Sequence, residues 1–309
     1  MIDRGTGTKL KVMDFRVRPP LSPFSLLFDL KLFRLKWPNK FTVPAAIATA
    51  PSMYKVGQPE GLDLLKREID EAGVDLIVIP GRRLSHAPAA VADSGETKMI
   101  VSDEDLLGLQ RTFDNRAFGL HGLNLDLPTD ELVAGFEQAI VKHGLRGGVM
   151  EPGYFQAPEG GVLTADNKKL YPLYETAIKH DVFIMHQSGI YAGPDIGVND
   201  WAPLDRALQK FPNLKLVLAH GGYPAVIEAC ALVTKHVNFY ISPDIYTHFP
   251  GGNIYVEAIS MLPDQFIYAS AYPFGPLKES VEGALQFPLS DDVMRKYLYG
   301  NAAKLLKLE

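Results

Sequence analysis

The sequence is poor in the features that mark several large classes of protein. Its 309 residues include one cysteine, Cys230, which excludes an intrachain disulfide and a Cys/His metal finger. No run of five basic residues occurs, and 31 Lys and Arg against 36 Asp and Glu give a net charge of −5. The longest apolar runs, such as Val74–Pro80, are far shorter than the roughly 20 residues of a membrane helix. The segment Met1–Lys11 lacks the apolar core of a secretory signal. We therefore expect a cytoplasmic protein with neither a membrane nor a nucleic-acid partner.

A short apolar run followed by an amphipathic stretch recurs along the chain. The runs are nearly all apolar rather than alternating, which is typical of parallel strands buried on both faces. The predicted strands are Lys11–Phe15, Asp75–Ile79, Ala117–Leu123, Gly147–Met150, Val182–Met185, Lys215–Ala219, Asn238–Ile241 and Gln265–Ala269. The predicted helices are Gly61–Ala72, Thr129–His143, Lys169–His180, Ala202–Phe211, Ala225–His236, Asn253–Leu262 and Lys278–Phe287.

This alternation predicts an α/β fold of the (β/α)8 TIM-barrel class, formed as a single domain of residues 1–309. The alternative is an open doubly wound sheet, but no glycine-rich phosphate-binding motif follows a strand. One segment, 19–57, interrupts the pattern with six prolines and an aromatic cluster. We expect an insertion after the first strand that acts as a lid or as a contact in a homo-oligomer. A packed loop without a mechanistic role is the alternative.

Two arginines follow the first predicted strand, at the end where barrel enzymes place their chemistry. Arg16 and Arg18 are two residues apart, so they lie on the same side of the strand. Neighbouring guanidinium groups repel each other, and their planar donor arrays match a carboxylate or a phosphate. We expect them to bind the carboxylate of a small organic substrate. A structural salt bridge to a nearby acidic residue is the alternative.

Acidic residues and histidines follow four other predicted strands. Glu151 follows the fourth strand and Asp244 the seventh, while His186 and His220 follow the fifth and sixth. Imidazole serves both as a base and as a metal ligand, and two histidines at equivalent positions favour function over packing. We expect the catalytic residues to be His220, Asp244 and Glu151. The further candidate substrate contacts are His186, Tyr223 and Tyr246.

The same strand ends hold the candidate ligands of a divalent metal. If zinc or manganese is bound, the ligand types available there are Glu151, His186, His220 and Asp244. Counted from the sequence, Arg16 and Arg18 balance the two carboxylates, so this site is already neutral without a metal.

Three segments at these strand ends resemble the amidohydrolase superfamily, and within it the amidohydrolase-2 group. They are residues 170–174 leading to His186, 218–222 around His220, and 270–274, and the resemblance covers nearly the whole chain. That group includes aminocarboxymuconate-semialdehyde and hydroxybenzoate-type decarboxylases and several lactone hydrolases. The resemblance implies a TIM barrel that hydrolyses or decarboxylates a small carboxylated compound.

The resemblance also indicates where this sequence departs from the family. The family's usual metal ligands are a His-x-His pair on the first strand, a histidine on the fifth and an aspartate on the eighth. Carried over, these positions fall on Arg16 and Arg18, on His186 and on Ala271, while the family's catalytic histidine falls on His220. Arginine stays protonated and alanine has no donor atom, so three of these four ligand positions cannot bind a metal.

The sequence leaves three functions open. The first is a hydrolase of a small carboxylated substrate such as a lactone, in which the arginines hold the carboxylate and His220 or Asp244 activates water. Glu151 would then orient an arginine or transfer a proton. The second is a carboxy-lyase, in which the arginines stabilise an enolate and His220 protonates carbon. The third is a barrel that binds an anion without catalysis.

Overall fold

A parallel sheet surrounded by helices forms the body of the protein. The computed structural model describes residues 1–309 except 4–6, 22–51, 53–54, 85–98, 191 and 194–195. Within these residues one sheet holds seven parallel strands, in the order β11-β10-β9-β8-β7-β4-β3. Its strands are β3 (Met13–Asp14), β4 (Leu76–Pro80), β7 (Ala117–Gly122), β8 (Gly147–Met150), β9 (Phe183–Gln187), β10 (Lys215–Ala219) and β11 (Phe239–Ser242). Two antiparallel pairs accompany it: β1 (Ile2–Asp3) with β2 (Lys9–Leu10), and β5 (Arg83–Leu84) with β6 (Met99–Ile100).

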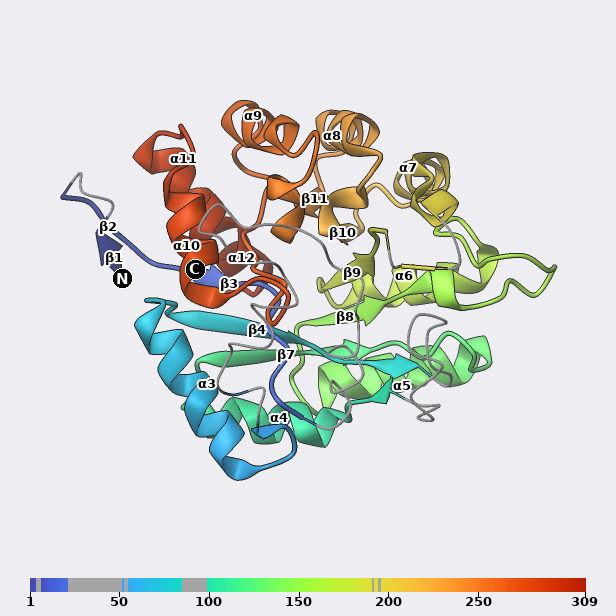
Figure 1. The fold of residues 1–309 in the computed structure, drawn as a ribbon. Coiled ribbons are helices and arrows are strands. Elements are labelled where there is room, and N and C mark those ends of the chain that lie inside the picture. The colour runs from blue at the N-terminus through green and yellow to red at the C-terminus, as the bar shows by residue number, and fades with distance from the viewer. Residues whose placement is uncertain (4–6, 22–51, 53–54, 85–98, 191, 194–195) are drawn as a thin grey trace.

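Helices lie around the outside of the strands (Figure 1). The α-helices are α3 (Pro59–Glu71), α4 (Asp103–Thr112), α5 (Thr129–Val141), α6 (Tyr171–Lys179), α7 (Trp201–Lys210), α8 (Val226–Lys235), α9 (Asn253–Met261), α10 (Leu277–Leu285), α11 (Asp291–Arg295) and α12 (Asn301–Leu305). In Figure 1, α3 to α5 lie below the sheet and α7 to α9 lie above it. The prediction of an α/β barrel is thus confirmed. No helix in the described part of the chain has the length and apolar character needed to cross a membrane.

The segment between α9 and α10 closes the barrel without forming a regular strand. Parallel bridges join it to Ile241 on one side and to Val17 on the other. The predicted strand Gln265–Ala269 therefore occupies the eighth position of the barrel. Its ladder is interrupted because the N–H of Tyr268 donates to the carbonyl of Tyr297, near the C-terminus, instead of to a neighbouring strand.

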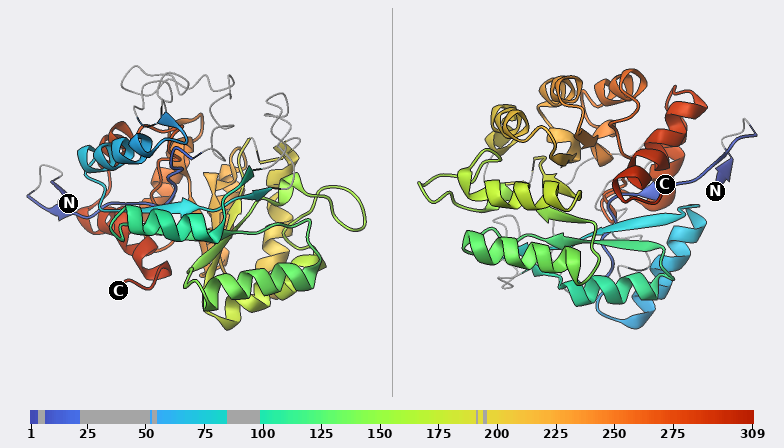
Figure 2. Two further views of the ribbon diagram at one scale, coloured as in Figure 1. Left: turned by 90° about the horizontal axis from the view of Figure 1, so that it is seen from below. Right: turned by 180° about the vertical axis from the view of Figure 1, so that it is seen from behind.

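Side chains fill the barrel interior, and the carboxyl ends of the strands are left for the residues of a functional site. Residues alternate along each strand, so that on β9 Phe183 and Met185 face the interior while Ile184 packs toward the helices. Residues of α12 join the interior cluster. Arg146, directly before β8, donates to the carbonyl of Leu306, so the C-terminal segment covers the amino end of the strands. Both chain termini lie on the same side of the molecule (Figure 2).

Three α-helices, α4, α11 and α12, escaped the sequence analysis. The seven predicted helices correspond to α3 and α5 to α10, with ends within two residues of the predicted ones. The longest of them, α4, begins with a capping box in which Ser102 and Asp105 each bond the other's backbone N–H. Residues 22–51 and 53–54 of the predicted insertion lie outside the described residues, so its role as a lid or subunit contact stays a prediction.

Candidate functional site

A buried ion pair between Arg16 and Asp244 stands at the carboxyl end of the barrel. Nη1 of Arg16 lies 2.5 Å from Oδ2 of Asp244, and their side chains are 1% and 0% exposed. Nη2 of Arg16 donates to Oε1 of Gln187 at 2.7 Å. The hydroxyl of Ser242 donates to Oδ1 of Asp244 at 2.5 Å. Arg16 therefore already has a protein carboxylate as its partner, which was the alternative to the predicted substrate clamp.

His220 lies against the same carboxylate oxygen. Its Nδ1 is 2.9 Å from Oδ2 of Asp244, although the two groups are not aligned for a hydrogen bond in this conformation. Burial, and then the charge of Arg16, lower the pKa of His220 to about 4. Burial raises the pKa of Asp244, but Arg16 and His220 outweigh it and bring it to about 2. A neutral imidazole thus stands beside an ionised carboxylate, and Nε2 is available as a base when the proton resides on Nδ1.

Glu151 pairs with Arg82, a residue that the sequence analysis missed. Nε and Nη2 of Arg82 donate to Oε1 and Oε2 of Glu151 at 2.8 and 2.5 Å, a bidentate arrangement. Burial raises the pKa of Glu151, but Arg82 and then Arg18 lower it below the usual value. The sequence signal was the Gly-Arg-Arg segment directly after the buried run of β4. The expectation that Glu151 orients an arginine agrees with this pair, and its catalytic role stays a prediction.

Arg18 has no carboxylate partner among the described residues. Its Nη1 donates to the main-chain carbonyls of Ala271 at 3.1 Å and Tyr272 at 3.3 Å. Its guanidinium carbon lies 5.5 Å from the ring centroid of Phe274. The residue is only 4% exposed. Burial, followed by the charges of Arg16 and Arg82, lowers the pKa of Arg18 well below its ordinary value. Its cationic side chain is therefore buried without a paired anion from the described residues.

The buried charges at the strand ends leave one positive charge uncompensated. The described part of the site holds three buried guanidinium groups, of which Asp244 and Glu151 neutralise two and leave that of Arg18. Asp14 accepts the main-chain N–H groups of Arg16 and Ser270, and burial raises its pKa to about 7, so it is mainly neutral below that pH. The neutral balance inferred from the sequence was wrong, because Arg82 had not been counted.

Aromatic side chains line the site beside His220. Tyr246 meets the His220 ring edge-on at 5.6 Å, and Tyr223 stacks on Tyr246 at 4.8 Å. Gly189, whose φ is 97°, makes room here, since a Cβ at this position would lie 3.0 Å from both His220 Cβ and the Tyr246 hydroxyl. The structure thus brings the two predicted tyrosines together at His220.

Three residues at the ends of successive barrel segments have a left-handed backbone. The φ angles of His220, Asp244 and Ala271 are 61°, 54° and 57°. This conformation costs a residue with a Cβ about 1 kcal/mol or more, and such strain gathers at functional sites. At Ala271 the left-handed turn directs the carbonyl that accepts from Arg18.

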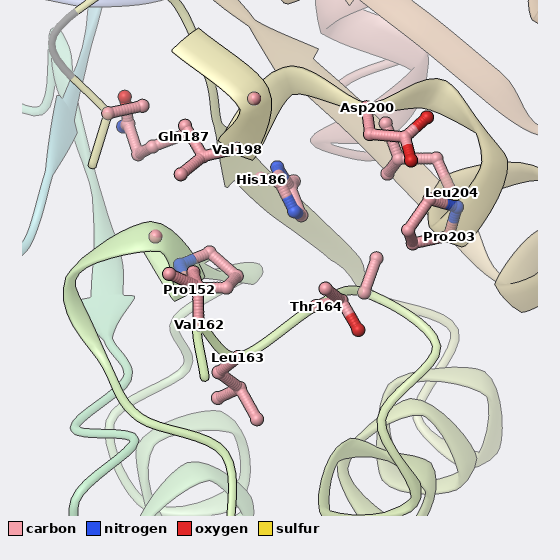
Figure 3. A pocket seen from close by; sticks show the side chains of 14 residues that line it. Pro152, Val162, Leu163, Thr164, His186, Gln187, Val198, Asp200, Pro203 and Leu204 are labelled. Atoms are coloured by element: carbon pink, nitrogen blue, oxygen red, sulfur yellow. The ribbon is translucent and has the colours of Figure 1, made fainter. Parts of the chain in front are cut away.

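His186 does not join this group. Its neighbours Met185 and Gln187 both contact Arg16, whereas His186 points to the other side of β9. There it lines a separate cavity with the loop after β8 and the start of α7 (Figure 3). The predicted site residues thus lie at two neighbouring positions, one around Arg16 and the other at the cavity of His186.

The residues present do not fit the metal centre considered from the sequence. Across the described ranges no three His, Cys, Asp or Glu side chains gather as metal ligands would. The four candidates do not converge, because Arg82 holds Glu151, Arg16 holds Asp244 and His186 faces its own cavity. A guanidinium 2.5 Å from the Asp244 carboxylate would repel a divalent cation placed there.

Comparisons with known proteins agree on the fold. An uncharacterised TIM-barrel protein of Bordetella bronchiseptica is 29% identical, with a TM-score of 0.76 and coverage of 96% of this chain and 99% of that one. A 2,6-dihydroxybenzoate decarboxylase, complexed with 2,6-dihydroxybenzoate, is 15% identical, with a TM-score of 0.68 and coverage of 97% and 100%. A 5-carboxyvanillate decarboxylase of Novosphingobium aromaticivorans, complexed with manganese and a nitrobenzoic acid, is 11% identical, with a TM-score of 0.67 and coverage of 99% and 100%.

Sequence comparison adds the family. No curated protein matches the chain significantly. The model of a family described as Amidohydrolase matches residues 101–308, which is more than half of the chain. The segments around His186, His220 and Ala271 all lie within that match. The chain therefore belongs to the amidohydrolase family.

Proposed function

We propose that this protein is an enzyme that holds a small organic substrate by its carboxylate at Arg18 and transforms it by acid–base catalysis at His220. The observation that carries the proposal is the buried guanidinium of Arg18, which has no carboxylate partner in the described part of the site. A buried charge is costly unless it is paired, so a monoanionic ligand would bind here with a gain that an exposed arginine does not offer.

The neighbouring groups suit acid–base chemistry. His220 is neutral at pH 7 because its pKa is lowered to about 4, so it can accept a proton from water or from a substrate. Asp244, 2.9 Å away, stays ionised and would stabilise the imidazolium that forms. Arg16 holds Asp244 in place. The half-buried ring of Tyr223, stacked on the buried Tyr246, offers apolar surface for a planar substrate.

Two reactions are compatible with this arrangement. Hydrolysis is supported by the Arg18 guanidinium, because a site that stabilises the substrate carboxylate in the bound state suits a reaction that leaves this carboxylate intact. Decarboxylation is supported at least as well by the comparisons, since the 2,6-dihydroxybenzoate and 5-carboxyvanillate enzymes share this fold. In that reaction His220 would carry the proton that replaces CO2 at carbon.

Labelled substrates separate the two reactions. Carboxylated lactones and hydroxybenzoates with a ¹³C carboxyl group would be incubated with the enzyme in H₂¹⁸O. Hydrolysis leaves the ¹³C in the product and adds one ¹⁸O, whereas decarboxylation releases ¹³CO2. If substrates bind and no turnover is found in either panel, the non-catalytic anion-binding barrel replaces the proposal.

The carboxylate site itself is tested by binding. We expect Arg18→Met to weaken the binding of benzoate about 10- to 100-fold in calorimetry, the loss typical of one charged hydrogen-bonding partner. Arg206→Met is the matched control, since Arg206 is 58% exposed on α7 and pairs with Asp166. Equal benzoate affinity in both variants would contradict the assignment of Arg18.

A further inference from the structure

A cavity of about 330 Å³ lies beside β9, next to the Arg16 site. The loop after β8 forms one wall, with Pro152 and Thr164, and the start of α7 forms the opposite one, with Pro203 and Leu204. His186 stands between the two walls, as Figure 3 shows. The volume is at the lower end of the range for small-molecule sites, about 300 to 1,000 Å³.

The imidazole of His186 is buried in the wall of this cavity. The residue is 6% exposed; its Nδ1 is shielded and has no hydrogen-bond partner among the described residues, so Nε2 is the ring nitrogen that a ligand can reach. Burial lowers the pKa of His186 to about 4, so the ring is neutral at pH 7 and has one donor and one acceptor. Buried polar groups are nearly always hydrogen-bonded, so a buried ring whose Nε2 is open to a cavity indicates a ligand.

The rest of the lining is mainly apolar and offers no partner to an anionic ligand. Neither lysine nor arginine lines the described cavity, so nothing there would pair with an anion. Its one carboxylate, Asp200, is exposed and accepts the N–H of Ala202 at 3.0 Å as the cap of α7. Leu163, Val198 and Leu204 supply apolar surface.

We propose that this cavity is a second binding site, for a neutral and mainly apolar molecule whose hydroxyl group hydrogen-bonds with His186. Gln187 links it to the first site, because this residue lines the cavity while its side-chain oxygen accepts from Arg16. The ligand would use none of the three buried arginines, so this site does not depend on the proposed carboxylate chemistry.

Phenol and toluene are matched probes, since they differ by a hydroxyl in place of a methyl group. Both would be titrated into the full-length protein, with binding followed through the NMR signals of the His186 ring. We expect saturable phenol binding at one site that shifts these signals, about 2- to 10-fold tighter than toluene, the value of one net hydrogen bond. Equal affinities, or no change at the His186 ring, would overturn the proposal.

Two variants locate the hydrogen bond. His186→Phe keeps an aromatic ring and removes both nitrogens, so the preference for phenol over toluene should disappear. Val198→Phe narrows the cavity and leaves His186 intact, so it should weaken both probes while the preference remains. Persistence of the preference in His186→Phe would assign it to another group and reject the site. The wild-type comparison of the two probes decides the matter even where a variant fails to fold.

Discussion

Arg82 and Glu151 form a buried bidentate ion pair, with both carboxylate oxygens accepting hydrogen bonds at 2.8 and 2.5 Å. Arg18 is buried to a similar degree but bonds only to main-chain carbonyls. The two arginines therefore differ in what their removal leaves behind. Without Arg82 a buried carboxylate loses its partner, whereas no described carboxylate loses a partner without Arg18.

This difference predicts unequal effects on stability. We expect Arg82→Met to lower the free energy of unfolding by about 3 to 5 kcal/mol, as for other broken buried ion pairs. Arg18→Met should cost less, because it removes an unpaired buried charge together with two bonds to carbonyl groups. Urea denaturation of both variants and of the wild type, followed by circular dichroism, measures the difference.

The double variant is the control for this pair. Glu151→Gln with Arg82→Met removes both charges, so it should be more stable than Arg82→Met alone. A larger loss in Arg18→Met than in Arg82→Met would mean that Arg18 has an anionic partner in the free protein.

The fold was predictable from the sequence because it depends on patterns that repeat along the chain. Runs such as Lys215–Ala219 match the observed strand, since the residues after Lys215 are all apolar and buried, as expected of a strand covered on both faces. The eighth strand was predicted at the right place, but its irregular ladder depends on the carbonyl of Tyr297, which is remote in sequence. The helix α4 was missed although Ser102 and Asp105 carry a recognisable capping box.

The site was less predictable, because it depends on which charged groups meet. Glu151 and Asp244 were recognised as pocket residues, but their partners, Arg82 and Arg16, are 69 and 228 residues away along the chain. No local pattern shows such a pairing. Likewise, His186 and Gln187 are adjacent in sequence and both line the cavity beside β9, yet of the two only Gln187 bonds to Arg16.

Buried histidines predict how stability depends on pH. The pKa values of His186, His220 and His248 are each lowered to about 4, primarily by burial. Between about pH 6.5 and pH 4 the unfolded chain therefore binds more protons at these positions, and stability falls as the pH falls. Each histidine contributes up to about 1.4 kcal/mol per pH unit in this window.

His248→Gln should make the free energy of unfolding less dependent on pH, because the variant lacks the one proton that unfolding adds at His248. The variant would be compared with the wild type by urea denaturation from pH 7.5 to pH 4.5. At pH 7.5 both histidine and glutamine are neutral, so that value serves as the reference for any loss of packing. An unchanged slope would show that His248 is protonated equally in the folded and unfolded protein.

Asp14 predicts the opposite dependence on pH. Burial raises its pKa to about 7, and its Oδ2 has no hydrogen-bond partner in the described structure. A raised carboxyl pKa stabilises the fold below the unfolded value near 4, and this contribution is lost as the pH rises through 7. Asp14→Asn removes this term, so the stability of the variant relative to the wild type should rise between pH 5 and pH 8. A difference that stays constant over this range would place the ionised Asp14 in a better solvated environment.

The side chains that could serve as metal ligands are already engaged by other residues, so we predict that catalysis does not depend on a tightly bound metal. Arg16 and Arg82 engage the carboxylates of Asp244 and Glu151, so a metal would have to displace two buried ion pairs before it found oxygen ligands. We expect elemental analysis of the purified, tag-free protein to find less than about a tenth of an equivalent of zinc or manganese. Turnover of a substrate found in the labelled panels should survive prolonged treatment with a chelator. About one equivalent of metal, with activity that a chelator abolishes and added metal restores, would contradict this reading. It would require Asp244 to exchange Arg16 for the metal in the working enzyme, and the predicted set of Glu151, His186, His220 and Asp244 would then be the first ligands to substitute.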